Sequence, residues 1–178
     1  MPVLADITLA VWAVLEVSVR VAEATRGKGH RDRDRATRVW IALSLAAAIG
    51  VALAVRGTAR LPVAGVAVMW LGLVLRAWAI VSLGASFRTT VEVDPGQAVV
   101  TRGPYRWIRH PSYTGLLVIV AGFGLAIGGW LSFLACLILP LPAIVRRIHV
   151  EESELERVLG DDYRAYASGR ARLIPRLW

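Results

Sequence analysis

The chain has 178 residues, 56% of them hydrophobic, and its 21 basic residues against 13 acidic ones give a formal charge of +8. A soluble domain is roughly 45 to 50% apolar, so this composition indicates an integral membrane protein. The charge does not indicate a nucleic-acid-binding protein, because the basic residues lie between apolar runs and form no soluble basic face with interleaved aromatics.

Five apolar segments follow one another along the sequence, at about 3–21, 39–55, 61–83, 113–128 and 130–147. At a rise of about 1.5 Å per residue, the third is long enough to cross a hydrocarbon core of about 30 Å. Gly128 and Gly129 separate the last two segments and predict a tight turn, so that these segments form a helical hairpin. The first segment lacks the flanking features of a signal peptide, so we expect it to be a retained span.

The lysines and arginines are distributed unevenly over the connections between these segments. The connections 22–38 and 84–112 and the tail from residue 146 hold seventeen, whereas the second connection holds only Arg56 and Arg60. By the positive-inside rule, the N-terminus lies outside, and both basic connections and the tail lie in the cytoplasm.

The composition changes after the fifth segment, where charged residues alternate with hydrophobic ones at helical spacing. Gly160 interrupts this pattern as a break or a cap. We expect an amphipathic helix in the membrane interface or against the cytoplasmic ends of the bundle. Together these elements predict an all-α integral membrane protein with about five transmembrane helices and a C-terminal cytoplasmic helix, in a single domain over residues 1–178. The hydrophobic stripe of the tail consists of Val150, Leu155, Val158, Leu159, Tyr163 and Tyr166.

Polar residues gather in two places that the predicted topology brings to one face of the membrane, the 84–113 connection and the 146–176 tail. Pro111 suits the first turn of a helix, and the backbone amides that follow it, together with the helix dipole, can hold an anionic group. His110 and Tyr113 add directional donors. These features allow a ligand site between the two segments.

The tail contributes two adjacent carboxylates, Glu151 and Glu152, either as a solvated helix cap or as part of this site. Cations and carboxylates at one site suit a zwitterionic ligand, or a ligand with an anionic end and a hydroxyl or amino end. No metal site is predicted, because the three histidines are scattered and lack ligand spacing. Cys136, the only cysteine, lies within an apolar run, and we interpret it as a packing residue.

Some residues inside the apolar segments have two interpretations. Arg76, about 12 Å inside the third segment by helical rise, either lines a site or is structural and reaches the interface. Glu16 and Arg20 are four residues apart, which predicts a pair within the first helix. The glycines of the fourth segment either leave a groove for a lipophilic ligand or allow close helix packing, and they are Gly115, Gly122 and Gly124.

Two separated motifs resemble a known family. GPYRWIRHPSYTG (103–115), followed after one helical hairpin by RRIHVEESELERVLGDDYRAYASGRARLIP (146–175), is similar to the isoprenylcysteine carboxyl methyltransferase family, within the wider group that includes phospholipid N-methyltransferases. The similarity begins at GLVLRAWAIVSLGASF (72–87) and continues through GQAVVTRGPY (96–105). It covers about residues 72–176, well over half of the chain.

The resemblance implies a membrane-embedded methyltransferase that uses S-adenosyl-L-methionine, bound between the loop, the last hairpin and the tail. It assigns Arg147 to the catalytic site, where this residue aligns the carboxylate of the substrate. Arg76 is a second candidate for substrate binding. The candidate cofactor-binding residues are Thr90, Gln97, Ala98, Val99, Val100, Tyr105, His110, Pro111, Ser112, Tyr113 and Glu151.

The expected acceptor is a lipophilic molecule in the membrane, either a prenylated carboxylate or an unrelated bacterial analogue. A carboxylate is ionised at neutral pH and needs no general base, whereas an amine or phenol would need one, for which Glu152 and His149 are the nearest candidates. The arginine-rich chain indicates a bacterial inner membrane protein with a cytoplasmic site. The competing hypotheses are a phospholipid or amine N-methyltransferase, an NADPH-dependent reductase of sterol type, and a non-catalytic lipid-binding membrane protein.

Overall fold

The computed structural model describes residues 2–25, 35–55, 61–84 and 98–178. Within these ranges the regular elements are all helical, as the sequence predicts. They are α1 (Pro2–Thr25), α2 (Arg35–Ala54), α3 (Pro62–Leu83), the short 3-10 helix η2 (Gly103–Arg106), α4 (Pro111–Ile138), α5 (Leu141–Leu159) and α6 (Asp161–Ser168).

Prolines and glycines set several of the helix boundaries. Pro62 and Pro111 begin α3 and α4, where a missing backbone N–H costs nothing. Gly84 and Gly160 end α3 and α5 with φ values of 54° and 56°, which a residue with a Cβ adopts only with strain. The predicted break at Gly160 is confirmed, and α6 starts directly after it.

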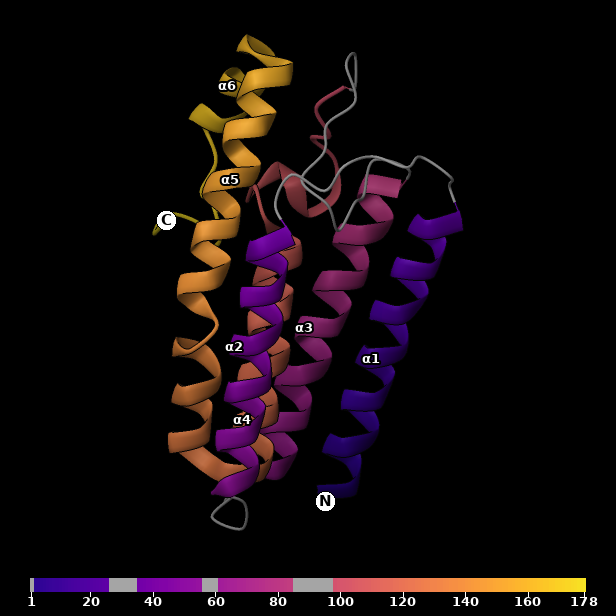
Figure 1. Ribbon diagram of the computed structural model, residues 1–178, viewed down its shortest axis with the longest axis vertical. Helices are drawn as coiled ribbons and strands as arrows, with labels where there is room; N and C mark the ends of the chain where they lie inside the picture. Colours follow the sequence, from indigo (N-terminus) through magenta and orange to yellow (C-terminus); the bar gives the residue numbers. More distant parts are fainter. Residues whose placement is uncertain (1, 26–34, 56–60, 85–97) are drawn as a thin grey trace.

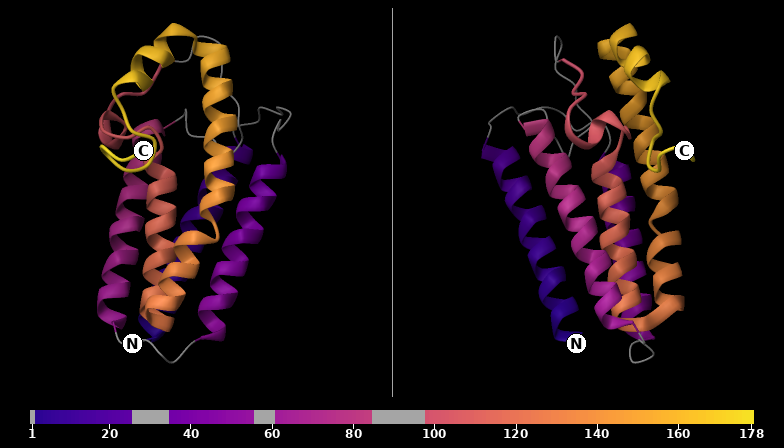
Figure 2. Two further views of the ribbon diagram at one scale, coloured as in Figure 1. Left: turned by 90° about the vertical axis from the view of Figure 1, so that its left-hand side faces the viewer. Right: turned by 180° about the vertical axis from the view of Figure 1, so that it is seen from behind.

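The predicted hairpin is present, although one helix assignment runs across it. Gly129 has φ 71° and ψ −153° inside α4, so the helical backbone is interrupted there. The chain reverses direction at this point and returns along α2 into α5 (Figures 1 and 2). The helix then continues to Leu159, beyond the predicted end of the fifth segment at residue 147.

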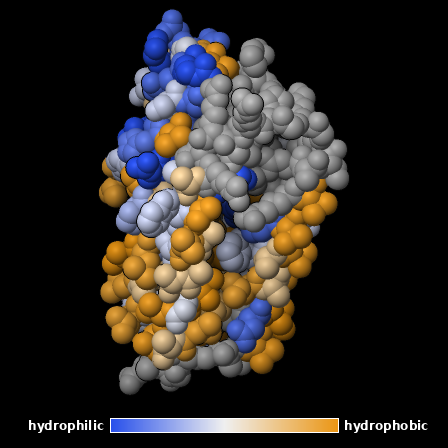
Figure 3. All heavy atoms as spheres, in the orientation of Figure 1, coloured by the Kyte–Doolittle hydropathy of each residue, from blue (hydrophilic) through white to orange (hydrophobic). Residues whose placement is uncertain are grey.

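Three stretches of the described chain are long and apolar enough to cross a membrane, Ala36–Ala54, Pro62–Leu83 and Pro111–Leu159. The third has 49 residues and contains the reversal at Gly129. Hydrophobic residues cover most of the lower part of the visible face, and hydrophilic residues gather over the upper end of α5 and α6 (Figure 3). The N-terminus lies at the apolar end, opposite α6 (Figure 1).

Glycines allow α3 and α4 to pack with their backbones in contact. A Cβ on Gly72 would lie 2.7 Å from the Ile119 nitrogen, and one on Gly122 would lie 2.6 Å from the Met69 nitrogen. Real Cβ contacts are never this short, so these positions exclude larger residues. The alternative left open by the sequence is therefore decided in favour of close helix packing. Such packing also holds for Gly115, against α3, and Gly124, against the returning arm of the hairpin.

The structure also shows where Cys136 and the predicted hydrophobic stripe of the tail lie. Cys136 is buried, and its thiol donates to the Ala48 carbonyl of α2 at 3.5 Å, which confirms its interpretation as a packing residue. Tyr163 and Tyr166 of the predicted tail stripe are buried. The α5 part of the stripe is only half-buried, because the fully buried face of α5 consists of Ile144, Arg147, Ile148 and Glu152.

Replacement of Gly122 by Ala should destabilise the protein by about 1–3 kcal/mol, because the new methyl group must push α3 and α4 apart. Gly50 on α2 provides the matched control, since nothing lies within 4 Å of a Cβ there. Gly50→Ala should be neutral or stabilising by up to about 1 kcal/mol through helix propensity. Thermal unfolding of the detergent-purified variants measures both effects, and equal melting temperatures would contradict the packing argument.

Candidate functional site

Backbone hydrogen bonds join the segment before α4 to the C-terminal segment. Ile108 and Ala171 form a parallel bridge, in which the Arg109 N–H donates to the Ala171 carbonyl at 2.8 Å. The His110 N–H donates to the Arg172 carbonyl at 2.9 Å. From the top of α5 the chain crosses back over the bundle through α6 to reach this position (Figure 2). The two polar segments therefore meet at one end of the bundle.

Side chains strengthen this junction. The Tyr166 hydroxyl of α6 donates to the Tyr105 carbonyl of η2 at 2.9 Å. Burial raises the pKa of Tyr166 to about 12, so the phenol remains protonated at neutral pH and keeps this bond. Burial, followed by the nearby Glu151 carboxylate, raises the pKa of Tyr105 well above its usual range. Tyr105 is therefore a neutral residue of the junction.

The carboxylate of Glu152 joins cations from both segments. Its Oε1 lies 2.7 Å from Arg109 Nη1 and 3.1 Å from His110 Nε2, and its Oε2 accepts from Arg172 Nε at 2.8 Å. Glu152 and His110 are each only 5% exposed. This clasp, defined as Arg109, His110, Glu152 and Arg172, ties α5 to the start of α4 and to the C-terminal segment.

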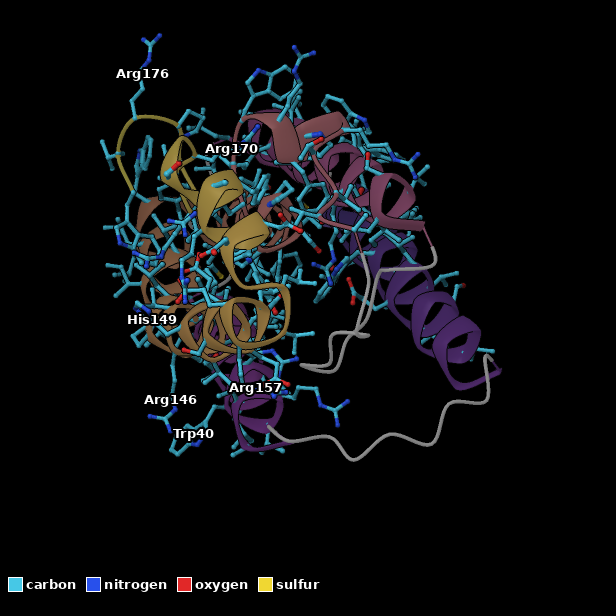
Figure 4. The ribbon with its side chains drawn as sticks, turned by 90° about the horizontal axis from the view of Figure 1, so that it is seen from above. Trp40, Arg146, His149, Arg157, Arg170 and Arg176 are labelled. Carbon is cyan, nitrogen blue, oxygen red and sulfur yellow. The ribbon has the colours of Figure 1, made fainter. Side chains whose placement is uncertain are left out.

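A second polar cluster lies beside the clasp and contains three predicted site residues. The Tyr113 hydroxyl donates to Glu151 Oε2 at 2.9 Å, and Arg147 Nε donates to the same hydroxyl at 3.3 Å. Arg147 Nη1 donates to Thr37 Oγ1 of α2 at 3.1 Å. Arg147 is 2% exposed, whereas Arg146, the preceding residue, points away from the bundle (Figure 4).

The start of α4 separates the two clusters. His110 and Pro111 are buried, and no side chain of the described residues caps the first turn. The His110 carbonyl accepts the N–H groups of Tyr113 and Thr114 at 3.1 and 3.2 Å. Because Tyr113 points to Glu151 and His110 to Glu152, this one turn contacts both adjacent carboxylates of α5.

The remaining predicted site residues precede η2 in the sequence. Ala98, Val99 and Val100 are in irregular backbone that precedes η2. Thr90 and Gln97 are outside the described residues, so their assignment stays a prediction.

Arg76 is buried and contacts two other helices. Its guanidinium forms two bonds to Glu16 of α1 and two to Ser112 of α4. Both oxygens of Glu16 thus accept from Arg76, a partner 60 residues away, and the predicted pair of Glu16 with Arg20 stays a prediction. The Arg20 side chain is outside the described residues. A contact between Arg76 and substrate stays a prediction.

Several members of these clusters were not predicted from the sequence. Thr37 stands near the start of an apolar helix, where a threonine gives no distinctive signal. Arg109 and Arg172 lie inside the two motifs, but their spacing does not indicate that they share one carboxylate. Only the backbone pairing of 108–110 with 171–172 brings them together.

Replacement of Glu152 by Gln should destabilise the protein by about 3–5 kcal/mol, because three donors lose a buried charged acceptor. The tail should also become more susceptible to limited proteolysis. Asp161→Asn is the control, since its pair with Arg164 is exposed on α6 and is worth about 0–1 kcal/mol. Thermal unfolding and proteolysis in detergent measure the difference, and similar behaviour of both variants would count against the clasp.

Comparison with known proteins gives consistent similarities over the region that holds these clusters. Residues 65–157 match the sequence pattern of the isoprenylcysteine carboxyl methyltransferase (ICMT) family. Protein-S-isoprenylcysteine O-methyltransferase B of Arabidopsis thaliana is 31% identical over 105 residues, which cover 58% of this chain and 53% of that protein. The Bacillus subtilis protein YpbQ, whose name states no activity, is 30% identical over 95 residues, which cover 49% of this chain and 56% of YpbQ.

A solved structure has a similar fold. The eukaryotic intramembrane Ras methyltransferase ICMT superposes with a TM-score of 0.62 at 27% identity, over 85% of this chain and 55% of that one. The chain spans about half the length of the relatives that it matches. The family match covers more than half of the chain, and the resemblance seen in its motifs is confirmed: the chain belongs to the isoprenylcysteine carboxyl methyltransferase family.

Proposed function

We propose that the protein transfers a methyl group from S-adenosylmethionine to the carboxylate of a lipophilic acceptor in the membrane. The observation that carries this proposal is the bonded chain from Arg147 through Tyr113 to Glu151. It places a buried cation and a carboxylate side by side at the start of α4, within the residues matched by the family. A zwitterionic cofactor and an anionic acceptor both find complementary groups there.

The first turn of α4 suits the anionic end of the cofactor. No side chain of the described residues caps it, and the Tyr113 and Thr114 N–H groups bond to the His110 carbonyl, so the turn offers an anion the Ser112 N–H and the positive end of the helix dipole. The bond to Glu152 fixes the orientation of the His110 ring. Glu151 supplies an acceptor for an amino or hydroxyl group. S-adenosylmethionine itself supplies an electrophilic methyl group, and the loop residues of the predicted set complete its surroundings.

Arg147 suits the alignment of an acceptor carboxylate. Its orientation is set by Tyr113 and Thr37, so the guanidinium is held in place before the acceptor arrives. Transfer to a carboxylate oxygen releases no proton, so this reaction needs positioning and exclusion of water but no base.

The candidate bases favour a carboxylate over an amine as acceptor. Glu152 is held by the Arg109 and Arg172 guanidinium groups and by the His110 ring, which occupy its oxygens. His149 is exposed and packs its ring against Trp178, 6.3 Å between centroids, on the outer side of the tail. Neither is placed to take a proton from an amine beside Arg147, so N-methylation is the weaker alternative.

The membrane arrangement follows from the helices and the charges. We infer five spans, formed by α1, α2, α3 and the two arms of the hairpin, with the clasp and the second cluster on the cytoplasmic side. The polar cofactor then enters from the cytoplasm, and the lipophilic acceptor enters laterally from the lipid. A bacterial inner membrane is the location that fits this composition.

Calorimetric titration of the detergent-purified protein should detect S-adenosylhomocysteine binding and no NADPH binding. Affinity for NADPH alone would instead support a sterol-type reductase, and affinity for neither would support a non-catalytic lipid-binding protein. Transfer of labelled methyl groups from the cofactor into a membrane lipid extract, with identification of the labelled product, then tests the acceptor class. A base-stable product would contradict carboxyl methylation, because methyl esters are hydrolysed by base.

Replacement of Arg147 by Gln should lower turnover by about a hundredfold, because the acceptor loses the cation that aligns it. The affinity for S-adenosylhomocysteine should change less than turnover. Arg146→Gln is the matched control, since Arg146 is adjacent on the same helix and exposed, and it should retain activity. Equal loss of turnover in both variants, or equal loss of affinity and turnover in Arg147→Gln, would contradict the role of Arg147.

A further inference from the structure

A continuous set of hydrogen bonds links α1, α3 and α4 in the apolar part of the bundle. Arg76 donates from Nε to Glu16 Oε1 and from Nη2 to Glu16 Oε2, the latter at 2.9 Å. Arg76 Nη1 donates to both the carbonyl and the hydroxyl oxygen of Ser112, each at 2.8 Å. Trp12, one turn before Glu16 on α1, donates from Nε1 to Glu16 Oε1 at 2.9 Å. All three guanidinium nitrogens are therefore bonded within the protein.

This set of bonds contains more than a neutralised pair of charges. The side chains of Arg76 and Glu16 are 9% and 17% exposed, and an uncompensated charge in such a place is costly. The two-point contact with Glu16 is sufficient to satisfy that requirement. The remaining nitrogen, Nη1, bonds to Ser112 of α4, so the ion pair also connects α1 and α3 to a third helix.

Ser112 is the second residue of α4, between Pro111 and Tyr113. The bond to its carbonyl holds the backbone of the first turn, and the bond to its hydroxyl holds the side chain. The approach of the two helices makes this contact rigid, because a Cβ on Gly115 would lie 2.9 Å from the Arg76 backbone nitrogen. The contacts of Arg76 therefore fix the position of the first turn of α4 relative to α3.

We propose that Glu16 and Arg76 are positioning residues, which hold the first turn of α4 in the orientation that binds the cofactor. The inference rests on the proposed function, because it takes this turn to be a cofactor contact. Glu16 lies outside residues 65–157, over which the family matches, and it bonds to Arg76, so α1 acts on this turn through Arg76. Arg76 acts through Ser112.

The test compares Arg76→Lys and Glu16→Gln with the unaltered full-length protein in detergent. Lysine keeps a positive charge beside Glu16, but it has one nitrogen in place of a planar fork and cannot hold Glu16 and Ser112 together. We expect about tenfold weaker binding of S-adenosylhomocysteine by calorimetry for Arg76→Lys. The KM for S-adenosylmethionine should rise by a similar factor, and saturating cofactor should restore turnover.

Glu16→Gln keeps the shape of the side chain and removes the charge that orients Arg76. It should weaken cofactor binding in the same direction, and it decides the outcome if Arg76→Lys does not fold. Met69→Ala is the control for general loss of stability, because Met69 is fully buried on the same helix and packs against Gly122, farther along α4 than Ser112. Its melting temperature should fall while its S-adenosylhomocysteine affinity is retained.

The outcomes separate the inference from the proposed function. Weaker binding in both charge variants, with retained binding in Met69→Ala, supports positioning. Unchanged affinity in Arg76→Lys and Glu16→Gln overturns it and leaves the proposed function intact, and so does an equal loss of affinity in Met69→Ala. Absence of S-adenosylhomocysteine binding by the unaltered protein overturns the proposed function and the positioning inference together.

Discussion

Burial of charge at one end of an apolar bundle is the constraint on which the rest of the structure depends. Arg76, Arg147 and Glu152 are each less than 9% exposed, and each bonds to groups from distant parts of the chain. Arg76 requires α1 and the start of α4, Arg147 requires α2 and Tyr113, and Glu152 requires the loop and the C-terminal segment. A buried charge that loses its partner destabilises a protein strongly, so these contacts select one arrangement of the helices.

The glycines of α3 and α4 make that arrangement geometrically possible. Gly72 and Gly115 face each other where the two helices cross, and Gly122 lies against Met69 farther into the bundle. Because the backbones touch, the Arg76 side chain spans the distance to the first turn of α4 without leaving the protein interior. Apolar packing therefore fixes the distance across which the polar groups must bond. A larger residue at any of these glycines would disturb both the helix packing and the polar bonds across it.

Local signals in the sequence predicted the helices and their interruptions, because a break such as Gly160 acts within a few residues of itself. They did not predict tertiary partners. The role of Gly122 stayed open, since a groove and a close contact require the same residue, and only the opposite helix decides between them. Glu16 has a neighbour at helical spacing in Arg20, whereas its partner Arg76 is 60 residues away. Thr37 became part of the candidate site only through the position of α2.

The two adjacent carboxylates of α5 have different partners for a simple geometric reason. Successive residues of an α-helix point about 100° apart, so Glu151 and Glu152 face different neighbours. Glu151 reaches Tyr113, which also accepts from Arg147, while Glu152 binds the cations of the loop and the C-terminal segment. One helical turn thus belongs to both clusters, and a movement of α5 that takes Glu152 away from the C-terminal segment also moves Glu151. The C-terminal segment therefore supports the candidate site, although its backbone pairing with the loop carries none of the proposed chemistry.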